Sequence, residues 1–212
     1  MSYFFSRLKT KVYQLLHSTI LFRFGFGLRV AKGVWEKEYS GTDWDFLFSE
    51  DEKGHYLAII NQLKSNNATP KVLDIGSGHG ALYHYFKTSL TGNFKYSGVD
   101  ISENAIKKAN EQFAEADFKV VNYDFESVND KFDIVIFNEV LYYFVKPMKM
   151  LEKAFTENLL PGGVIIISMY KDSPGKNQLI WNSIAEKYKI LAEETVSSNK
   201  GATWTVKTVT TK

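Results

Sequence analysis

Two short segments in the second half of the chain are apolar at consecutive positions, and they constrain the fold most strongly. They are DIVIF at residues 133–137 and VIIIS at residues 164–168. A strand with one solvent face alternates apolar and polar residues, whereas a strand buried on both faces is apolar throughout. These segments therefore predict parallel strands at the centre of a sheet that helices cover on both sides.

Strand-like and helix-like segments alternate from residue 52 onward, which is typical of such a sheet. The expected strands are residues 71–75, 94–100, 118–124, 131–140 and 162–170, followed by two weaker β-branched segments near 190–196 and 202–210. The expected helices are residues 80–90, 102–116, 146–157 and 177–190, with Ser102 as the N-cap of the second. We expect one α/β sandwich over residues 51–212, preceded by a helical extension or lid at residues 1–50.

The first expected strand runs into a glycine-rich turn, VLDIGSGHG at residues 72–80. Ligands bind beyond the carboxyl ends of parallel strands, and glycine lets a ligand approach the main chain closely. Gly76, Gly78 and Ala81 satisfy a dinucleotide fingerprint, so an NAD-binding oxidoreductase is one alternative. Asp74 argues against it, because a carboxylate there repels a pyrophosphate and attracts a cationic ligand such as S-adenosylmethionine.

Two more aspartates end the next expected strands. Asp100, at the end of 94–100, can accept hydrogen bonds from ribose hydroxyls, which suits NAD and S-adenosylmethionine equally. Asp124, at the end of 118–124, can accept from an adenine amino group, and Phe125 offers a face for the ring. Three carboxylates at successive strand ends predict one acidic crevice.

The motifs resemble, in content and order, those of class I S-adenosylmethionine-dependent methyltransferases. They are DIGSGHG (74–80), GVD (98–100), NYDFE (122–126), FDIVIFNEVLYYF (132–144) and LLPGGVIIIS (159–168). The resemblance implies a Rossmann-like three-layer sandwich with a seven-stranded sheet, order 3-2-1-4-5-7-6, strand 7 antiparallel, and S-adenosylmethionine as cofactor. The residues that it implies for donor binding are Asp74, Gly76, Ser77, Gly78, Gly80, Asp100, Ile101, Asp124, Phe125 and Asn138.

The fourth motif bears on the acceptor. Methyltransferases of adenine or glutamine amino nitrogens carry [D/N]-P-P-[Y/F] where this chain has Asn-Glu-Val-Leu at 138–141, so we expect no nucleic-acid partner. NEVLYYF (138–144) is similar to the nodulation-factor N-methyltransferases, which act on amino-sugar oligomers, and to relatives in glycan pathways. We expect O- or N-methylation of a small molecule of sugar or glycan type. The alternatives are a small-metabolite methyltransferase unrelated to glycans and a non-catalytic module that keeps the cofactor fold.

Three residues are candidates for catalysis. Glu139 follows the fourth strand with no apparent structural duty, so it is the first candidate for a general base. His79 lies in the glycine turn, although a supporting position behind the site explains it more simply. Tyr142 can stack on a sugar ring. A lid over the cofactor or a hydrophobic plug account equally well for Trp35, Tyr39 and Trp44.

The N-terminal segment is strongly basic. Residues 1–35 contain six basic residues and no acidic residue, and the apolar run around Arg23 is too short to span a bilayer. The favoured interpretation is a helix that packs on the domain with a basic solvent face. The alternatives are peripheral contact of residues 1–30 with an anionic membrane and a transit peptide. We expect a cytoplasmic protein.

Cysteine is absent from the chain, which excludes disulfides and thiolate metal sites. The four histidines are scattered without a metal-binding spacing. The sequence therefore predicts no resident metal.

Overall fold

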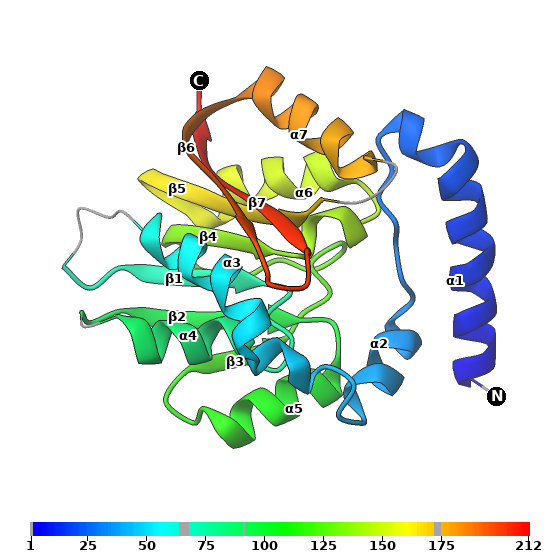
Figure 1. The fold of residues 1–212 in the computed structure, drawn as a ribbon, viewed down its shortest axis with the longest axis horizontal. Coiled ribbons are helices and arrows are strands. Elements are labelled where there is room, and N and C mark those ends of the chain that lie inside the picture. Colours follow the sequence, from blue (N-terminus) through cyan, green and yellow to red (C-terminus); the bar gives the residue numbers. More distant parts are fainter. Residues whose placement is uncertain (1, 64–67, 91, 172–174) are drawn as a thin grey trace.

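A seven-stranded sheet forms the centre of the computed structural model, which describes residues 2–63, 68–90, 92–171 and 175–212 (Figure 1). The order is β3-β2-β1-β4-β5-β7-β6, and β7 is antiparallel to both of its neighbours while the pairs from β3 to β5 are parallel. The strands are β1 (Lys71–Ile75), β2 (Lys95–Asp100), β3 (Asp117–Val120), β4 (Phe132–Asn138), β5 (Leu159–Tyr170), β6 (Tyr188–Ser197) and β7 (Thr203–Thr211). The expected strand order and the antiparallel seventh strand are confirmed.

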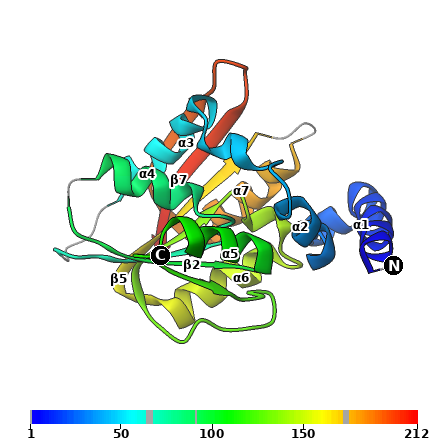
Figure 2. The ribbon, with the colours of Figure 1, turned by 90° about the horizontal axis from the view of Figure 1, so that it is seen from below.

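Helices cover both faces of the sheet (Figures 1 and 2). One face carries α3 (Glu50–Asn61), α4 (Ala81–Ser89) and α5 (Glu103–Gln112). The other carries α6 (Pro147–Lys153), a π-helical turn η4 (Ala154–Asn158) and α7 (Lys176–Lys187). In β4, Ile134 and Ile136 join the first core cluster while Val135 and Phe137 join the second. Burial on both faces is the reason why this strand is apolar at consecutive positions.

Strand β3 is shorter than the sequence predicts. It ends at Val120, and the backbone N–H of Val121 donates to the Asp100 carbonyl at 2.9 Å. The chain then turns, because the N–H groups of Phe125 and Glu126 both donate to the carbonyl of Asn122. Asp124 therefore lies in a turn beyond the strand rather than at its end, which corrects the expected span of 118–124.

Helix α7 also ends earlier than the sequence predicts. The expected helix at 177–190 stops at Lys187, and β6 begins directly at Tyr188 without an intervening turn. Tyr188 is buried and its successors alternate between more and less exposed positions, which is the pattern of a half-buried strand. The sequence carries no glycine or proline at this change of structure, so nothing local marked it.

The N-terminal extension consists of α1 (Ser2–Thr19), a 3-10 turn η1 (Leu21–Phe24), α2 (Lys32–Tyr39) and a second 3-10 turn η2 (Asp45–Phe48). Residues 25–31, here called the strap, join η1 to α2. Helix α1 stands beside the domain with the strap next to it (Figures 1 and 2). Of its side chains that the structure describes, the buried ones, Thr10 and His17, are polar, and the exposed ones include large apolar side chains. The favoured expectation of a basic solvent face is therefore incomplete, because the outward face is apolar as well.

The strap packs tightly against the loop that follows β4. The N–H of Leu28 donates to the Tyr142 carbonyl at 2.6 Å, and a Cβ placed on Gly27 would lie 2.1 Å from the Phe144 carbonyl oxygen. Only glycine allows this approach of two main chains. Within the described residues, no helix is long and apolar enough to cross a membrane.

Phe86 of α4 is fully buried beside Phe94 and Tyr96, with ring centroids 5.5 and 5.4 Å away. We expect Phe86→Ala to lower the free energy of unfolding by about 3–5 kcal/mol, because it leaves a cavity in the core. Phe125→Ala is the matched control, since that ring is 72% exposed and its loss should change stability by less than about 0.5 kcal/mol. Urea denaturation measures both, and equal losses would contradict this assignment of the core.

Candidate functional site

The glycine turn after β1 brings main chain and side chains into close contact. Gly76 and Gly78 have φ angles of +77° and +54°, a region that side chains disfavour. A Cβ on Gly76 would lie 2.3 Å from Val140 Cγ2, and one on Gly78 would lie 2.5 Å from the Tyr39 hydroxyl oxygen. Glycine is thus required here by backbone conformation and by space. Gly80 starts α4 behind the turn and is not part of the cavity wall.

A cavity of about 410 Å³ opens beside this turn, within the usual size range of small-ligand sites. Its walls come from the carboxyl ends of β1, β2 and β4, from the N-terminal extension, from α3 and from β7. Of the residues expected to bind the donor, those on its wall are Asp74, Gly76, Ser77, Gly78, Asp100, Ile101, Asp124 and Asn138. The structure therefore brings most of the expected set together.

Asp74 is the most deeply buried acid of the site, with 1% of its surface exposed. Its Oδ2 accepts a hydrogen bond from the Tyr96 hydroxyl at 2.5 Å, and its Oδ1 has no partner among the described residues. Burial raises the pKa of Asp74 to about 7, the bond from Tyr96 opposes that rise, and the charge of Asp100 adds to it. A cation entering the cavity would favour the ionised carboxylate.

Asp100 holds the glycine turn against the start of α5. Its Oδ2 accepts from the N–H of Gly78 at 3.0 Å and its Oδ1 from the N–H of Ser102 at 2.8 Å. Burial raises the pKa of Asp100 to about 6 although both hydrogen bonds favour the ionised form. Ser102 caps α5 as expected, accepting from the N–H of Ala105 at 3.2 Å.

Asp124 and Phe125 occupy different environments. Asp124 lines the cavity, and its Oδ1 accepts from the N–H of Val145 at 3.1 Å. Burial raises its pKa, while the Val145 N–H and then Arg29 oppose the rise. Phe125 is 72% exposed and lies outside the cavity wall. The expectation that its ring faces the adenine is therefore not supported, because the turn after β3 points it to solvent.

Ser77 and Asn138 complete the polar wall. The Ser77 Oγ and the Asn138 Oδ1 are buried without hydrogen-bond partners among the described residues, as is the Asp74 Oδ1. Unpaired buried polar atoms are uncommon in folded proteins because each carries a desolvation cost. Three of them on one cavity wall indicate a site built for a polar ligand.

Glu139 lies at the end of β4 in a strained backbone conformation, with φ at +56°. Its Oε1 accepts from the Ser168 hydroxyl at 3.0 Å, and its Oε2 accepts from the Tyr142 hydroxyl at 2.9 Å and the Tyr170 N–H at 3.0 Å. The expectation that Glu139 has no structural duty is wrong, since it joins two strands and a loop. Burial raises its pKa to about 7 against these hydrogen bonds. Tyr142 lines the cavity beside it.

His79 is not on the cavity wall. Its ring is 3% exposed and packs edge-on against Phe48 at 4.9 Å and beside Tyr39 at 5.5 Å. Burial lowers its pKa, so the neutral form is favoured. This placement corrects the catalytic candidate: His79 supports the glycine turn from behind and reaches no ligand in the cavity.

The extension forms one side of the cavity. Trp35, Tyr39 and Trp44 are all on its wall and pack on one another, with Trp44 stacked on Tyr39 at 5.8 Å. Trp35 also meets Tyr143 edge-on at 5.1 Å. These rings thus have two roles: they cover the cavity, and they join the extension to the domain.

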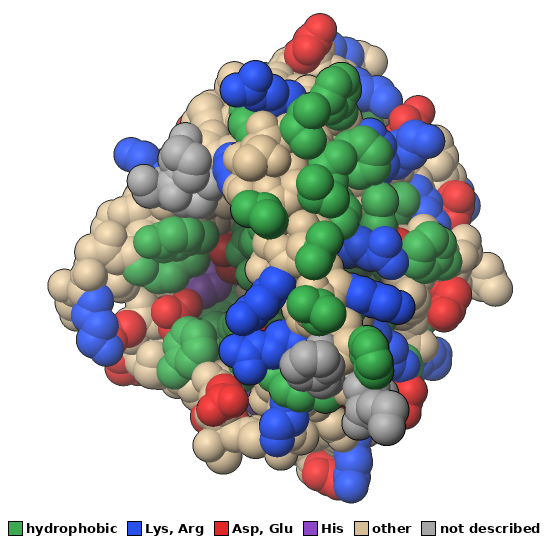
Figure 3. All heavy atoms as spheres, turned by 90° about the vertical axis from the view of Figure 1, so that its right-hand side faces the viewer, with side chains coloured by type: hydrophobic (Ala, Val, Ile, Leu, Met, Phe, Trp, Pro, Cys, Tyr) green, Lys and Arg blue, Asp and Glu red, His purple; other side chains and the backbone are tan. Residues whose placement is uncertain are grey.

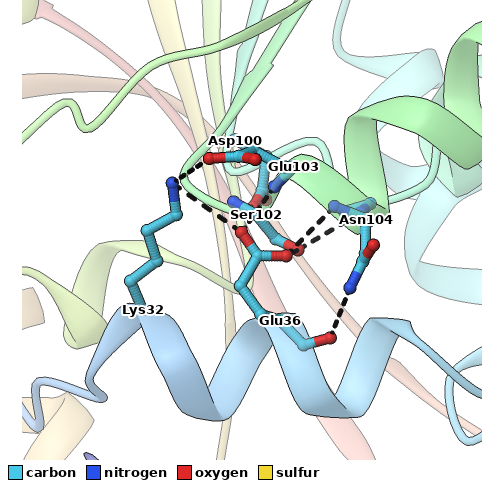
Figure 4. A network of polar contacts seen from close by, with 7 residues as sticks. Lys32, Glu36, Asp100, Ser102, Glu103 and Asn104 are labelled. Carbon is cyan, nitrogen blue, oxygen red and sulfur yellow. Dashed lines mark hydrogen bonds and ion pairs between the residues drawn. The ribbon is translucent and has the colours of Figure 1, made fainter. Parts of the chain in front are cut away.

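Glu36 of α2 fixes this cover onto α5 (Figure 4). Its carboxylate accepts from the Ser102 hydroxyl at 2.9 Å and from the N–H groups of Glu103 and Asn104 at 2.8 and 3.1 Å. The Asn104 side chain donates in turn to the Glu36 carbonyl at 2.8 Å, and Lys32 pairs with Glu103 at 2.7 Å. A negative charge at a helix N-terminus is stabilising, so α2 supplies an additional cap to α5.

Several wall residues were missed by the sequence analysis. Glu52 and His55 come from α3, and Trp204 comes from β7. His55 is 1% exposed, stacks on Trp204 at 4.8 Å, and has no hydrogen-bond partner for either ring nitrogen among the described residues. Burial lowers the pKa of His55 to about 3, which keeps the ring neutral. These segments carry no motif, so only the folded arrangement reveals them.

A second cavity of about 560 Å³ adjoins the first. The two share Tyr142, Tyr143 and Tyr170 on their walls. The second is lined further by η1, the strap, the start of α6 and α7. The tyrosines therefore stand at the junction of two compartments, next to Glu139.

Comparison with known proteins identifies related sequences. A family model described as a methyltransferase domain matches residues 66–210. Protein 235L of Invertebrate iridescent virus 6, described as a methyltransferase, is 33% identical over 94 residues, 42% of this chain and 34% of that protein. The release factor glutamine methyltransferase of Buchnera aphidicola is 28% identical over 156 residues, 69% of this chain and 54% of that protein. The chain thus matches about a third and about half of the length of these curated relatives.

Among solved structures, N-methyltransferase NodS from Bradyrhizobium japonicum, in complex with S-adenosyl-L-homocysteine, is similar with a TM-score of 0.67. The sequences are 15% identical, and the match covers 84% of this chain and 97% of NodS. At this identity the likeness shows the shared fold.

The raised pKa of Asp74 predicts a pH-dependent affinity for S-adenosylmethionine. With a pKa of about 7, the carboxyl group is mostly ionised at pH 8 and mostly protonated at pH 6. If the cation binds the ionised form, the Kd should rise about tenfold from pH 8 to pH 6. Calorimetry measures it. Asp74→Asn should bind S-adenosylmethionine weakly at pH 8, and its Kd should change less with pH. The exposed control Asp117→Asn should show the same pH dependence of the Kd as the wild type. An unchanged profile in Asp74→Asn would contradict the role of Asp74.

Glu36→Ala should weaken S-adenosylmethionine binding by about fivefold, because a capping interaction is worth about 1 kcal/mol and here holds the cover closed. Glu111→Ala is the matched control. Glu111 is an exposed glutamate on α5, the helix that Glu36 caps, and its Oε1 lies 3.9 Å from the Lys107 Nζ. Calorimetry at pH 8 compares the two. Equal affinities would show that the cover closes without Glu36.

Proposed function

The chain belongs to the class I S-adenosylmethionine-dependent methyltransferase family, and on that premise we propose that it methylates a small molecule of the sugar or glycan type. The single observation that carries the proposal is the junction of the two cavities. There Glu139 and the shared tyrosines lie between the first cavity, which Asp74, Asp100 and Asp124 line, and the second cavity. A donor site and an acceptor site that meet at one polar group are what a transfer reaction needs.

The residues present fit the donor. Asp74 and the glycine turn would hold its methionine part, Asp100 its ribose and Asp124 its adenine. The buried oxygens of Asp74, Ser77 and Asn138 that find no partner in the described part of the chain support this arrangement, because a ligand with an ammonium group and hydroxyls supplies the donors that they lack. An NAD-binding oxidoreductase is set aside, because family membership and the position of Asp74 both favour a cationic donor.

The protein contributes mainly position and exclusion of water. When bound, S-adenosylmethionine supplies a methyl group that a positively charged sulfur makes electrophilic. The walls align an acceptor lone pair with that methyl group, and alignment of this kind is worth about 7–11 kcal/mol of the barrier. Trp35, Tyr39 and Trp44 shield the site, which lowers the cost of a step that disperses charge.

Glu139 is the proposed general base. A pKa of about 7 lets its carboxylate take a proton from an acceptor hydroxyl or ammonium group near neutral pH. It accepts three hydrogen bonds from the described residues, and an ionised carboxylate offers about four such sites, so we expect one to remain for the acceptor. The strained backbone at Glu139 supports a functional role, since strain of this kind clusters at active sites.

A sugar-type acceptor is supported by the rings at the junction. Tyr142, Tyr143 and Tyr170 present aromatic surfaces with polar tips, and Tyr142 is tied to Glu139. One observation favours a small metabolite unrelated to glycans instead: the far wall of the second cavity includes the apolar side chains of Phe22, Phe26, Leu28, Met148 and Ile180.

We assign residues 1–50 as the lid and residues 51–212 as the donor-binding domain. The lid supplies the aromatic wall, and the domain supplies the acids and Glu139. The boundary falls where η2 ends and α3 begins.

A labelled-methyl transfer assay tests the acceptor class. Purified protein and S-adenosylmethionine labelled on the methyl group are incubated with a panel of amino sugars, chitin-type and other oligosaccharides, and with non-sugar metabolites of matched size. We expect label on a sugar hydroxyl or amino nitrogen, located by mass spectrometry. Transfer confined to non-sugar metabolites would favour the alternative, and tight donor binding without transfer would favour a non-catalytic module.

Glu139→Gln should lower kcat by about 10²–10⁴-fold, because it removes the general base while keeping the shape of the side chain. In the wild type, kcat should rise with pH around an apparent pKa of about 7, and the variant should lose this dependence. The affinity for S-adenosylmethionine should stay within about threefold, since the acids that hold the donor are intact.

Glu152→Gln is the control, because that exposed residue pairs with Lys187 on the surface and lines neither cavity. It should keep the kcat of the wild type. A Glu139→Gln variant with full activity and an unchanged pH profile would remove Glu139 as the base.

A further inference from the structure

Helix α1 carries its apolar side chains on the face that points away from the protein. Phe5, Leu8, Val12, Leu15 and Leu16, here called the α1 ridge, are between 49% and 66% exposed. At about 100° per residue they fall on the side opposite to Thr10 and His17, which are buried. Figure 3 shows the apolar side chains gathered in a band over this face, with Lys and Arg beside them. An apolar band of this kind marks an interaction surface.

The polar side of α1 is bound to the strap. The Tyr13 hydroxyl donates to the Gly27 carbonyl at 3.0 Å, a ring nitrogen of His17 lies 2.9 Å from the Phe26 carbonyl, and the N–H of Ala31 donates to the Thr10 hydroxyl at 3.1 Å. These contacts fix the rotation of the helix about its axis. The α1 ridge therefore points outward because these hydrogen bonds hold the opposite, polar face of the helix against the strap.

Positive charge flanks the α1 ridge. Lys9 and Lys11 lie on its two sides by helical geometry, and Arg7 and Arg23 are exposed near its two ends. The first acidic residue of the chain is Glu36, beyond the strap. A basic apolar helix face is complementary to an anionic lipid surface, where apolar side chains enter the acyl boundary and lysines reach the headgroups.

We propose that α1 docks on an anionic membrane surface through the α1 ridge, with Arg7, Lys9, Lys11 and Arg23 against the lipid headgroups. A second copy of the chain is a poorer partner, because an interface between two ridges brings like charges together on both flanks. The proposal goes beyond methyl transfer and does not rest on it. Figure 3 shows a hollow beside the α1 ridge on the same face of the protein. Docking through the ridge would therefore bring that opening close to the membrane.

Vesicle co-sedimentation of the full chain tests the proposal. The probes are phosphatidylcholine vesicles and vesicles in which part of that lipid is replaced by phosphatidylserine. We expect at least tenfold stronger binding to the anionic vesicles, weakened by added salt. Leu8→Glu should lower that binding at least tenfold, and the pair Lys9→Gln with Lys11→Gln should lower it several-fold.

Leu191→Glu is the matched control, because Leu191 in β6 has the same 49% exposure as Leu8 but lies outside the ridge. It should bind vesicles like the wild type. Thermal unfolding checks that all variants are folded, and S-adenosylmethionine affinity should be the same in all of them. Equal binding to neutral and anionic vesicles, or full binding by Leu8→Glu, would overturn the proposal. So would a lipid-free dimer in analytical ultracentrifugation that Leu8→Glu dissociates, since it would assign the ridge to a second copy.

Discussion

A carboxylate buried near the carboxyl end of β1 is the constraint on which the site depends. Asp74 is almost fully excluded from solvent, and among the described residues only Tyr96 donates a hydrogen bond to its carboxylate, which leaves the second oxygen unpaired. Placing a charge there opposes folding, which is why the carboxyl group binds its proton so readily. In the proposed function a positively charged donor offsets this unfavourable burial, so we expect Asp74 to contribute to selectivity for a cation.

Asp100 of the domain and Glu36 of the extension both bind the start of α5. Asp100 holds Gly78 and the start of α5, and Glu36 holds the same helix start from the other side. The Tyr39 hydroxyl also packs against Gly78. Asp100 and the extension therefore bind neighbouring backbone N–H groups in the glycine turn and at the start of α5. Because the extension contacts both segments and lines the cavity, we expect it to be part of the donor site that the proposed function requires.

The sequence predicts the sheet well and the site in part. Consecutive apolar residues in β4 predict a buried parallel strand, and the ordered motifs at strand ends carry the resemblance that implied the strand order and most of the residues found on the cavity wall. Phe125 and His79 were misplaced because a turn at Asn122 and the packing of Phe48 decide where they point. His55 and Trp204 were missed since they meet only when α3 crosses β7, where Gln62 bonds to Thr208 and Val206. The outward face of α1 could not be read from periodicity, which reveals that a helix is two-sided but not which side meets the protein.

The walls of the donor cavity are drawn from nearly the whole chain, between Val30 near the beginning and Trp204 in the last strand. A ribosome delivers the chain from its N-terminus at a finite rate, and α3, α4 and the first strands emerge before β7 exists. The cavity can therefore be complete only after β7 has taken its place between β5 and β6, because Trp204 forms part of its wall.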